Sequence, residues 1–161
     1  MLPPDFLTQD TVATDVQIQS KKRLLEFVAE LFAEKNSQTR TTDIFERLIE
    51  RERLGSTGLG KGIALPHARV DGLQQARAIF VRLQDSIDFD AIDGQPVDLV
   101  IALLVPTDAS DTHLKILAGL AQFFSNDSNC EILRETQDKQ TLVETLLNGI
   151  ESFQQIETSP G

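Results

Sequence analysis

A histidine beside a glycine-rich stretch is the part of this sequence best suited to chemistry. Residues 51–70 read RERLGSTGLGKGIALPHARV, with glycines at positions 55, 58, 60 and 62. Glycine lets the backbone approach a ligand closely and turn its N–H groups toward an anion. His67 follows Pro66, where a short apolar run over residues 63–65 stops. We therefore take His67 as the centre of function, with an anion held beside it.

The second histidine, His113, falls in the first turn of a predicted helix. The exposed N–H groups and the dipole at a helix N-terminus favour an anion and disfavour an imidazolium. A neutral His113 can then donate an N–H to a phosphoryl oxygen. Basic residues also gather in and beside the glycine stretch, namely Arg51, Arg53, Lys61 and Arg69. Together these features predict a local anion-binding site.

Other chemistry fits the residues less well. Residues 55–61 satisfy the G-x-x-x-x-G-K pattern of phosphate loops, but Gly62 stands where the Mg²⁺-binding hydroxyl is required and a helix precedes the loop. No G-x-S-x-G nucleophile elbow occurs. Two distant histidines without a carboxylate at ligand spacing make a poor zinc site, and the single Cys130 excludes an internal disulfide. We expect neither a metal nor a cofactor.

Composition restricts the class of protein further. The chain has 161 residues, 40% of them hydrophobic and 25% charged, which suits one globular domain. A formal net charge of −10 argues against broad binding of nucleic acid phosphates. Because no long apolar run or signal-peptide pattern is found, we expect no membrane insertion and a cytoplasmic location.

Hydrophobic periodicity predicts five helices. Residues 20–35 repeat apolar side chains at helical spacing, and a second helix runs from an N-cap at Thr42 to about Arg53. After a cap at Asp111 or Thr112, a third helix is expected to turn Leu114, Leu117, Ala121 and Phe124 toward the core, with Leu120 and Phe123 alongside. A short helix over 131–135 and a last helix with Gly149 as its C-cap follow.

Strands are predicted between these two groups of helices. Residues 76–83 alternate in type, 87–89 suggest a short return element, and 97–105 are apolar at almost every position, as in a strand covered on both faces. The first dozen residues suggest a loose lead-in or an edge element. The fold class is therefore α/β: a single-domain sandwich with a mixed central sheet flanked by helices on its faces, over residues 10–150, followed by a flexible tail over 151–161.

Three segments together resemble a known family: GSTGLGKGIALPH, FDAIDGQPVDLVIALLVP, and the sequence Thr-His-Leu at 112–114. They are similar to the enzyme IIA domain of the fructose and mannitol class of the bacterial phosphotransferase system, particularly its stand-alone nitrogen-regulatory branch. The likeness covers residues 20–147. It implies that His67 carries a phosphoryl group, with His113 and Arg51 as active-site partners. Backbone N–H groups of Gly55, Ser56, Thr57 and Gly58 are expected to add hydrogen bonds to it.

The resemblance also implies partners. The donor would be a histidine-phosphorylated carrier protein similar to HPr, and regulatory targets such as transporters or kinases would follow the phosphorylation state. The chain contains no membrane segment or second domain with a phosphorylatable cysteine, which favours the regulator. A sugar-specific IIA subunit that passes the group to a IIB domain remains the alternative, and a binding module without transfer is the third.

Overall fold

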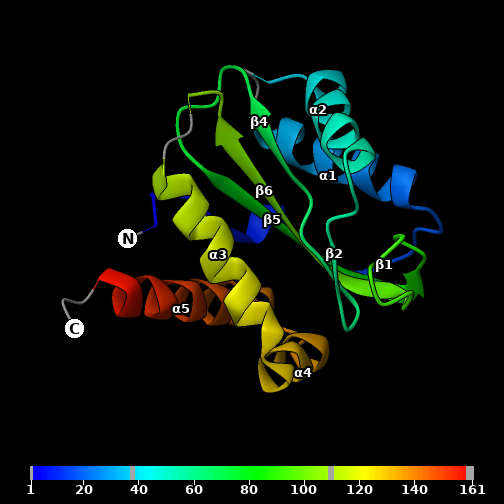
Figure 1. Cartoon of the computed structure of the whole chain (residues 1–161), viewed down its shortest axis with the longest axis vertical. Coiled ribbons are helices and arrows are strands. Elements are labelled where there is room, and N and C mark those ends of the chain that lie inside the picture. Colours follow the sequence, from blue (N-terminus) through cyan, green and yellow to red (C-terminus); the bar gives the residue numbers. More distant parts are fainter. Residues whose placement is uncertain (1, 37–38, 109–110, 159–161) are drawn as a thin grey trace.

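The computed structural model describes residues 2–36, 39–108 and 111–158, which form one mixed sheet with helices on both faces (Figure 1). The helices are α1 Lys21–Lys35, α2 Thr41–Arg53, α3 Asp111–Ser125, α4 Asp127–Glu135 and α5 Lys139–Thr158, with a 3-10 turn at Gln9–Thr11. The strands are β1 Val12–Val16, β2 Gly58–Gly60, β3 Ile63–Ala64, β4 His67–Val70, β5 Arg77–Ile87 and β6 Val97–Pro106. The predicted fold class is confirmed.

The central strand β6 explains the layered arrangement. Its neighbours are β5 on one side and β3 with β4 on the other, in the order β1-β5-β6-β3-β2. Leu99 and Ile101 point into a core with α3, α4 and α5, whereas Val100 and Ala102 point into a second core with α1 and α2. Because both faces are buried, nearly every position of β6 is apolar, as the sequence predicted.

Strands β3 and β4 form one interrupted strand along β6. Ile63 pairs with Leu99 and His67 with Leu103, so the register is the same before and after the interruption. Pro66 lies between them, and its carbonyl accepts the N–H of Leu103 at 2.9 Å. We expected the apolar run to end before His67, but His67 is the first residue of β4. It is therefore held by regular strand pairing.

The N-terminal helices begin close to where the pattern placed them. Ser20 caps α1 by accepting the N–H of Arg23 at 3.1 Å, and α1 confirms the predicted helix. The N-cap predicted at Thr42 is wrong, since the N–H of Ile44 already bonds to the carbonyl of Arg40 and makes Arg40 the cap residue. Helix α2 ends at Arg53 as expected, with Arg51 in its last turn.

Several downstream boundaries differ from the prediction. β5 continues to Ile87, so residues 87–89 are not a separate return element. α4 starts at Asp127 rather than 131, because the side chain of Asn126 caps it. α5 passes through Gly149, where a Cβ would lie 2.2 Å from the ring of Phe123. This glycine permits a close helix crossing and is not a C-cap.

The two ends of the chain are more structured than the pattern indicated. Residues 151–158 of the expected tail are helical, and residues 159–161 lie outside the described part of the chain. At the other end, Leu2, Phe6 and Leu7 are buried in the core before the expected domain start at residue 10. β1 then forms the sheet edge beside β5, which confirms an edge element there.

The face of α3 was predicted only in part. The helix begins at Asp111, so Asp111 and Thr112 are its first two residues. Its buried side chains are Ile116, Leu120, Phe123 and Phe124. The expected core position of Leu114 is wrong, because 61% of its surface is exposed.

Candidate functional site

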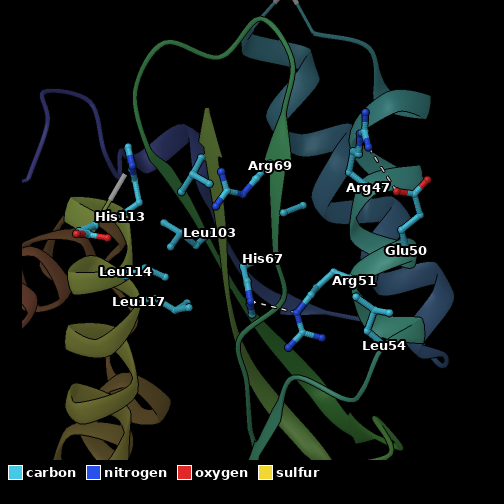
Figure 2. Close-up of a pocket in the computed structure, with 13 residues that line it drawn as sticks. Arg47, Glu50, Arg51, Leu54, His67, Arg69, Leu103, His113, Leu114 and Leu117 are labelled. Carbon is cyan, nitrogen blue, oxygen red and sulfur yellow. Dashed lines mark hydrogen bonds and ion pairs between the residues drawn. The ribbon is translucent and has the colours of Figure 1, made fainter. Parts of the chain in front are cut away.

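A cavity of about 540 Å³ opens between α2, β4, β6 and α3 (Figure 2). His67 projects from β4, between Arg51 on α2 and His113 on the first turn of α3. The three side chains that the sequence singled out therefore line one cavity, although they come from separate elements. The rest of its lining mixes apolar and charged groups: Arg47, Glu50, Leu54, Ala68, Arg69, Leu103, Val105, Asp111, Leu114 and Leu117.

The two ring nitrogens of His67 have different partners. Nδ1 lies 2.9 Å from the carbonyl oxygen of Leu65, which can only accept, so Nδ1 carries the proton and donates it. Nε2 accepts a hydrogen bond from Nε of Arg51 at 3.2 Å. The imidazole is thus held as the Nδ1–H tautomer, and its lone pair on Nε2 lies beside a guanidinium in the cavity.

The pKa of His67 lies below the ordinary histidine value because burial disfavours the charged imidazolium. The hydrogen bond to Leu65 acts in the opposite direction, the positive charge of Arg51 lowers the pKa again, and the negative charge of Glu52 raises it. The net lowering keeps the ring neutral near pH 7. A neutral ring is the form in which Nε2 can act as a nucleophile.

Arg51 reaches the histidine from the last turn of α2. Its Nη1 donates to the carbonyl of Gly55 at 2.9 Å, and its Nε donates to His67. Neither acceptor carries a negative charge, so the charge of this guanidinium is not neutralised by its hydrogen bonds. It is available to an anion that enters the cavity.

The wall formed by α3 carries His113, Leu114 and Leu117 (Figure 2). The positive end of the α3 dipole lies at this turn, where it favours an anion. Arg69 of β4 also lines the cavity and donates to the carbonyl of Thr107 at 3.0 Å. Arginines of α2 and β4 and the dipole of α3 therefore bring positive charge to the cavity, which the carboxylates of Glu50 and Asp111 also line.

The glycine-rich loop uses most of its N–H groups internally. The amide of Gly55 donates to the carbonyl of Glu52 at 3.2 Å, that of Thr57 to the Glu52 carboxylate at 3.2 Å, and that of Gly58 to the Ser56 hydroxyl at 3.0 Å. Three of the four backbone donors expected at Gly55, Ser56, Thr57 and Gly58 thus already have partners, two of them on Glu52 of α2 and one on Ser56.

Sequence reasoning missed two parts of the site. Arg47 on α2 and Leu54, the residue after α2, line the cavity beside Arg51, and their spacing of four and three residues from it was the signal that could have found them. Leu54 is 85% exposed. The buried carboxylate of Glu52 was also missed, because nothing in the pattern distinguishes it from the exposed acids around it.

Residues 2–36, 39–108 and 111–158 contain neither a cluster of metal-ligating side chains nor a membrane-spanning helix. This part of the chain contains no group of three or more His, Cys, Asp or Glu side chains that could hold a metal ion. None of its helices has the length and apolar character that a membrane span requires.

Comparisons with known proteins identify relatives of this chain. The chain is 43% identical over 143 residues to a nitrogen regulatory protein from Klebsiella oxytoca, covering 88% of each chain. It is 41% identical over 141 residues to one from Escherichia coli K12, covering 87% of this chain and 86% of the relative.

A solved structure supports the same relationship. The nitrogen regulatory protein IIA-Ntr from Neisseria meningitidis superimposes with a TM-score of 0.83 at 41% identity, covering 88% of this chain and 96% of that one. Residues 5–149 match the family described as "Phosphoenolpyruvate-dependent sugar phosphotransferase system, EIIA 2". The chain therefore belongs to the EIIA 2 family of the phosphoenolpyruvate-dependent sugar phosphotransferase system.

Proposed function

We propose that this protein accepts a phosphoryl group on Nε2 of His67 from a phosphohistidine on an HPr-like carrier protein, and that the phosphorylated and free forms regulate different partners. The observation that carries the proposal is the pair of contacts on the His67 ring. Leu65 holds the proton on Nδ1, and Nε2 lies in the cavity beside Arg51. Family membership makes phosphoryl transfer the expected class of reaction.

The transfer step exchanges one P–N bond for another. The lone pair on Nε2 of His67 attacks phosphorus in line with the donor nitrogen, so a P–N bond forms at His67 while the donor's P–N bond breaks. The donor ring leaves as a neutral imidazole, with the proton already on its other nitrogen. His67 keeps its own proton on Nδ1, shared with the Leu65 carbonyl. No metal ion or further reactant is required.

Arg51 has to change its acceptor during this step. In the free protein its Nε donates to Nε2 of His67, which is the lone pair that attacks. As phosphorus approaches, the guanidinium moves its hydrogen bonds to the phosphoryl oxygens, where a charged acceptor gives a stronger bond. His113 approaches the same oxygens from α3 and donates through an N–H. Both side chains stabilise the charge that spreads over the transferring group.

A protein donor suits the shape and lining of the cavity. Leu54, the residue after α2, and Leu114, on α3, lie on opposite walls of the cavity. Leu54 is 85% exposed and Leu114 is 61% exposed. Exposed apolar side chains around a functional group are typical of a protein-binding surface. A regulatory role is supported by the relatives named nitrogen regulatory protein. The alternative, a sugar-uptake IIA subunit, is supported by 33% identity to a fructose-specific EIIA component from Haloferax volcanii.

The test is to mix the protein with phosphoenolpyruvate, enzyme I and an HPr-like carrier and to measure its intact mass. We expect one acid-labile, base-stable phosphoryl group, absent from His67→Ala. An undiminished label in that variant would contradict the proposal. His113→Ala is expected to slow transfer by about two- to tenfold, the value of one hydrogen bond, without unfolding the domain. Addition of a fructose-type IIB domain distinguishes the two roles, because rapid loss of the label to IIB would favour uptake.

A further inference from the structure

One hydrogen bond is missing from the ladder that leads to His67. Strands β2 and β3 are antiparallel, with Gly58 opposite Ala64, so the next pair in register is Thr57 and Leu65. The N–H of Leu65 donates to the carbonyl of Thr57 at 2.9 Å, which makes this a hydrogen-bonded pair. In such a pair the two residues normally exchange both N–H···O bonds. The return bond would run from the N–H of Thr57 to the carbonyl of Leu65.

Two side chains replace that return bond. The N–H of Thr57 donates to Oε2 of Glu52 at 3.2 Å instead. The carbonyl of Leu65 accepts from Nδ1 of His67 at 2.9 Å. Each backbone group is satisfied by a residue from outside the pair, as buried polar groups require. A carbonyl oxygen can accept two hydrogen bonds, but here the Thr57 N–H does not share the Leu65 oxygen with His67 because it donates to Glu52 instead.

The surroundings of Glu52 hold its carboxylate in place to accept the N–H of Thr57. It follows Arg51 on α2, is only 8% exposed, and also accepts a hydrogen bond from the hydroxyl of Thr57. Nζ of Lys21, the first residue of α1, lies 2.8 Å from Oε2 and offsets its charge. A buried carboxylate costs free energy unless it is paired and hydrogen-bonded, so we expect this one to have a role in the structure of the site.

We propose that Glu52 is a positioning residue for His67: by holding the N–H of Thr57, it leaves the Leu65 carbonyl to the Nδ1 proton and so acts together with Arg51, which donates to Nε2, to keep Nε2 the reactive nitrogen. Glu52 does not touch the phosphoryl group. The consequence for transfer rests on the proposed function above, whereas the consequence for the tautomer does not. Without the carboxylate, the acceptor in register for the Thr57 amide is the Leu65 carbonyl, so this amide competes with Nδ1 for the oxygen and the Nδ1–H tautomer loses part of its support.

The test is nitrogen-15 NMR of the His67 ring near pH 8, which distinguishes the Nδ1–H from the Nε2–H tautomer without any phosphoryl donor. The wild-type ring is expected to be mainly Nδ1–H. Glu52→Met removes the acceptor and is expected to populate the Nε2–H form. Glu52→Gln retains an acceptor oxygen for the Thr57 amide and is expected to restore Nδ1–H. Wild-type protein with its proton on Nε2, or a folded Glu52→Met with an unchanged ring, would overturn the proposal.

A matched control separates positioning from stability. Lys21→Met leaves Glu52 in place but removes its counter-charge, so we expect a lower melting temperature with the tautomer unchanged. If Glu52→Met alone does not fold, the double variant Lys21→Met with Glu52→Met removes both charges together, a replacement that proteins often tolerate. The double variant is expected to show the same tautomer change as Glu52→Met, and an unchanged Nδ1–H ring in it would refute the proposal.

Phosphoryl transfer gives the second measurement. The folded variant that lacks the Glu52 acceptor is expected to accept the phosphoryl group about two- to tenfold more slowly, since one aligning hydrogen bond is lost. Glu52→Gln is expected to recover most of that rate. If the wild type accepts no phosphoryl group but the tautomer still responds to Glu52, the proposed function fails while the positioning role stands. The reverse result would reject positioning alone.

Discussion

Two ends of the same glycine-rich stretch hold basic side chains in different ways. At the Lys61 end, Nζ of Lys61 lies 3.3 Å from Asp127, and Arg134 donates to both carboxylate oxygens of Asp98 at 2.8 Å. At the His67 end, Arg51 donates to an imidazole nitrogen and a carbonyl. Lys61 and His67 are only six positions apart in the sequence.

The difference lies in what neutralises each cation. A guanidinium paired with a carboxylate has its strongest acceptor already and serves to hold elements together. Arg134 does this, since it also donates to the carbonyl of Lys61 at 3.1 Å and so ties α4 to the turn after β2. A guanidinium on neutral acceptors exchanges them readily for an anion. The first arrangement is therefore structural, and the second is suited to binding a phosphoryl group.

The largest effect is expected from Arg51→Ala. Removing a group that stabilises charge in a transition state typically costs about 100-fold in rate, so phosphoryl transfer to His67 should fall by that order. The free energy of unfolding should change little because Arg51 is at a helix end and its bonds are partly exposed. Quench-flow transfer from the phosphorylated carrier and thermal unfolding measure the two quantities. A normal rate would contradict a role for Arg51 in phosphoryl transfer.

Arg134→Ala is the same substitution at the other end, with the opposite expectation. The lost pair is about one third exposed and partly screened, so the free energy of unfolding should fall by about 1–2 kcal/mol. Transfer to His67 should keep its rate, because Arg134 does not line the cavity. Urea unfolding and the transfer assay check this. If Arg134→Ala slowed transfer as strongly as Arg51→Ala, the contrast between the two ends would be wrong.

Leu114→Gln tests whether the apolar wall of the cavity contacts the donor. The carrier would cover Leu114 when it docks, and glutamine loses part of that apolar contact. The KM for the phosphorylated carrier should therefore rise by about three- to tenfold while the rate at saturation stays the same. Ile92→Gln is the matched control, since Ile92 is 89% exposed but lies in the loop next to Asp93, which bonds to Lys61. Equal KM changes in both variants would argue against a localised docking surface.

The smallest effect is a shift in pH dependence. The pKa of folded His67 lies below the unfolded value of about 6.5, so the ring is neutral at pH 6.5 and above, and transfer should decline only as the pH falls through the folded pKa. As the pH falls, the unfolded chain binds this proton before the folded chain does. The contribution of His67 to the free energy of unfolding is therefore complete above about pH 6.5 and is lost as the pH falls through the folded pKa. Arg51→Ala should raise the NMR titration midpoint of His67, and Arg134→Ala should not.

Much of the fold could be predicted because its signals are local. The apolar run of β6 and the periodicity of α1 depend on burial alone, and both elements were placed correctly. One helix end was placed wrongly because a distant residue decides the outcome. Gly149 has the composition of a helix end, yet Phe123 on another helix makes it a crossing point.

The residues of the site also divide into those that the sequence pattern marks and those that it does not. His67 and His113 stand out because the chain has two histidines, and the glycine stretch marks the first. Nothing in the pattern distinguishes Leu114 as a cavity wall, because an exposed leucine and a core leucine look alike at helical spacing. Glu52 gains its importance from a register between β2 and β3 that only three-dimensional pairing sets.

The buried N-terminal segment has a practical consequence for anyone who shortens this protein. Phe6 is almost fully buried, and its carbonyl accepts the N–H of Ala78 at 2.7 Å, at the start of β5. A fragment cut at residue 10, the domain start expected from the sequence, would expose the hydrophobic surface that Leu2, Phe6 and Leu7 cover. Such a fragment would be prone to aggregate.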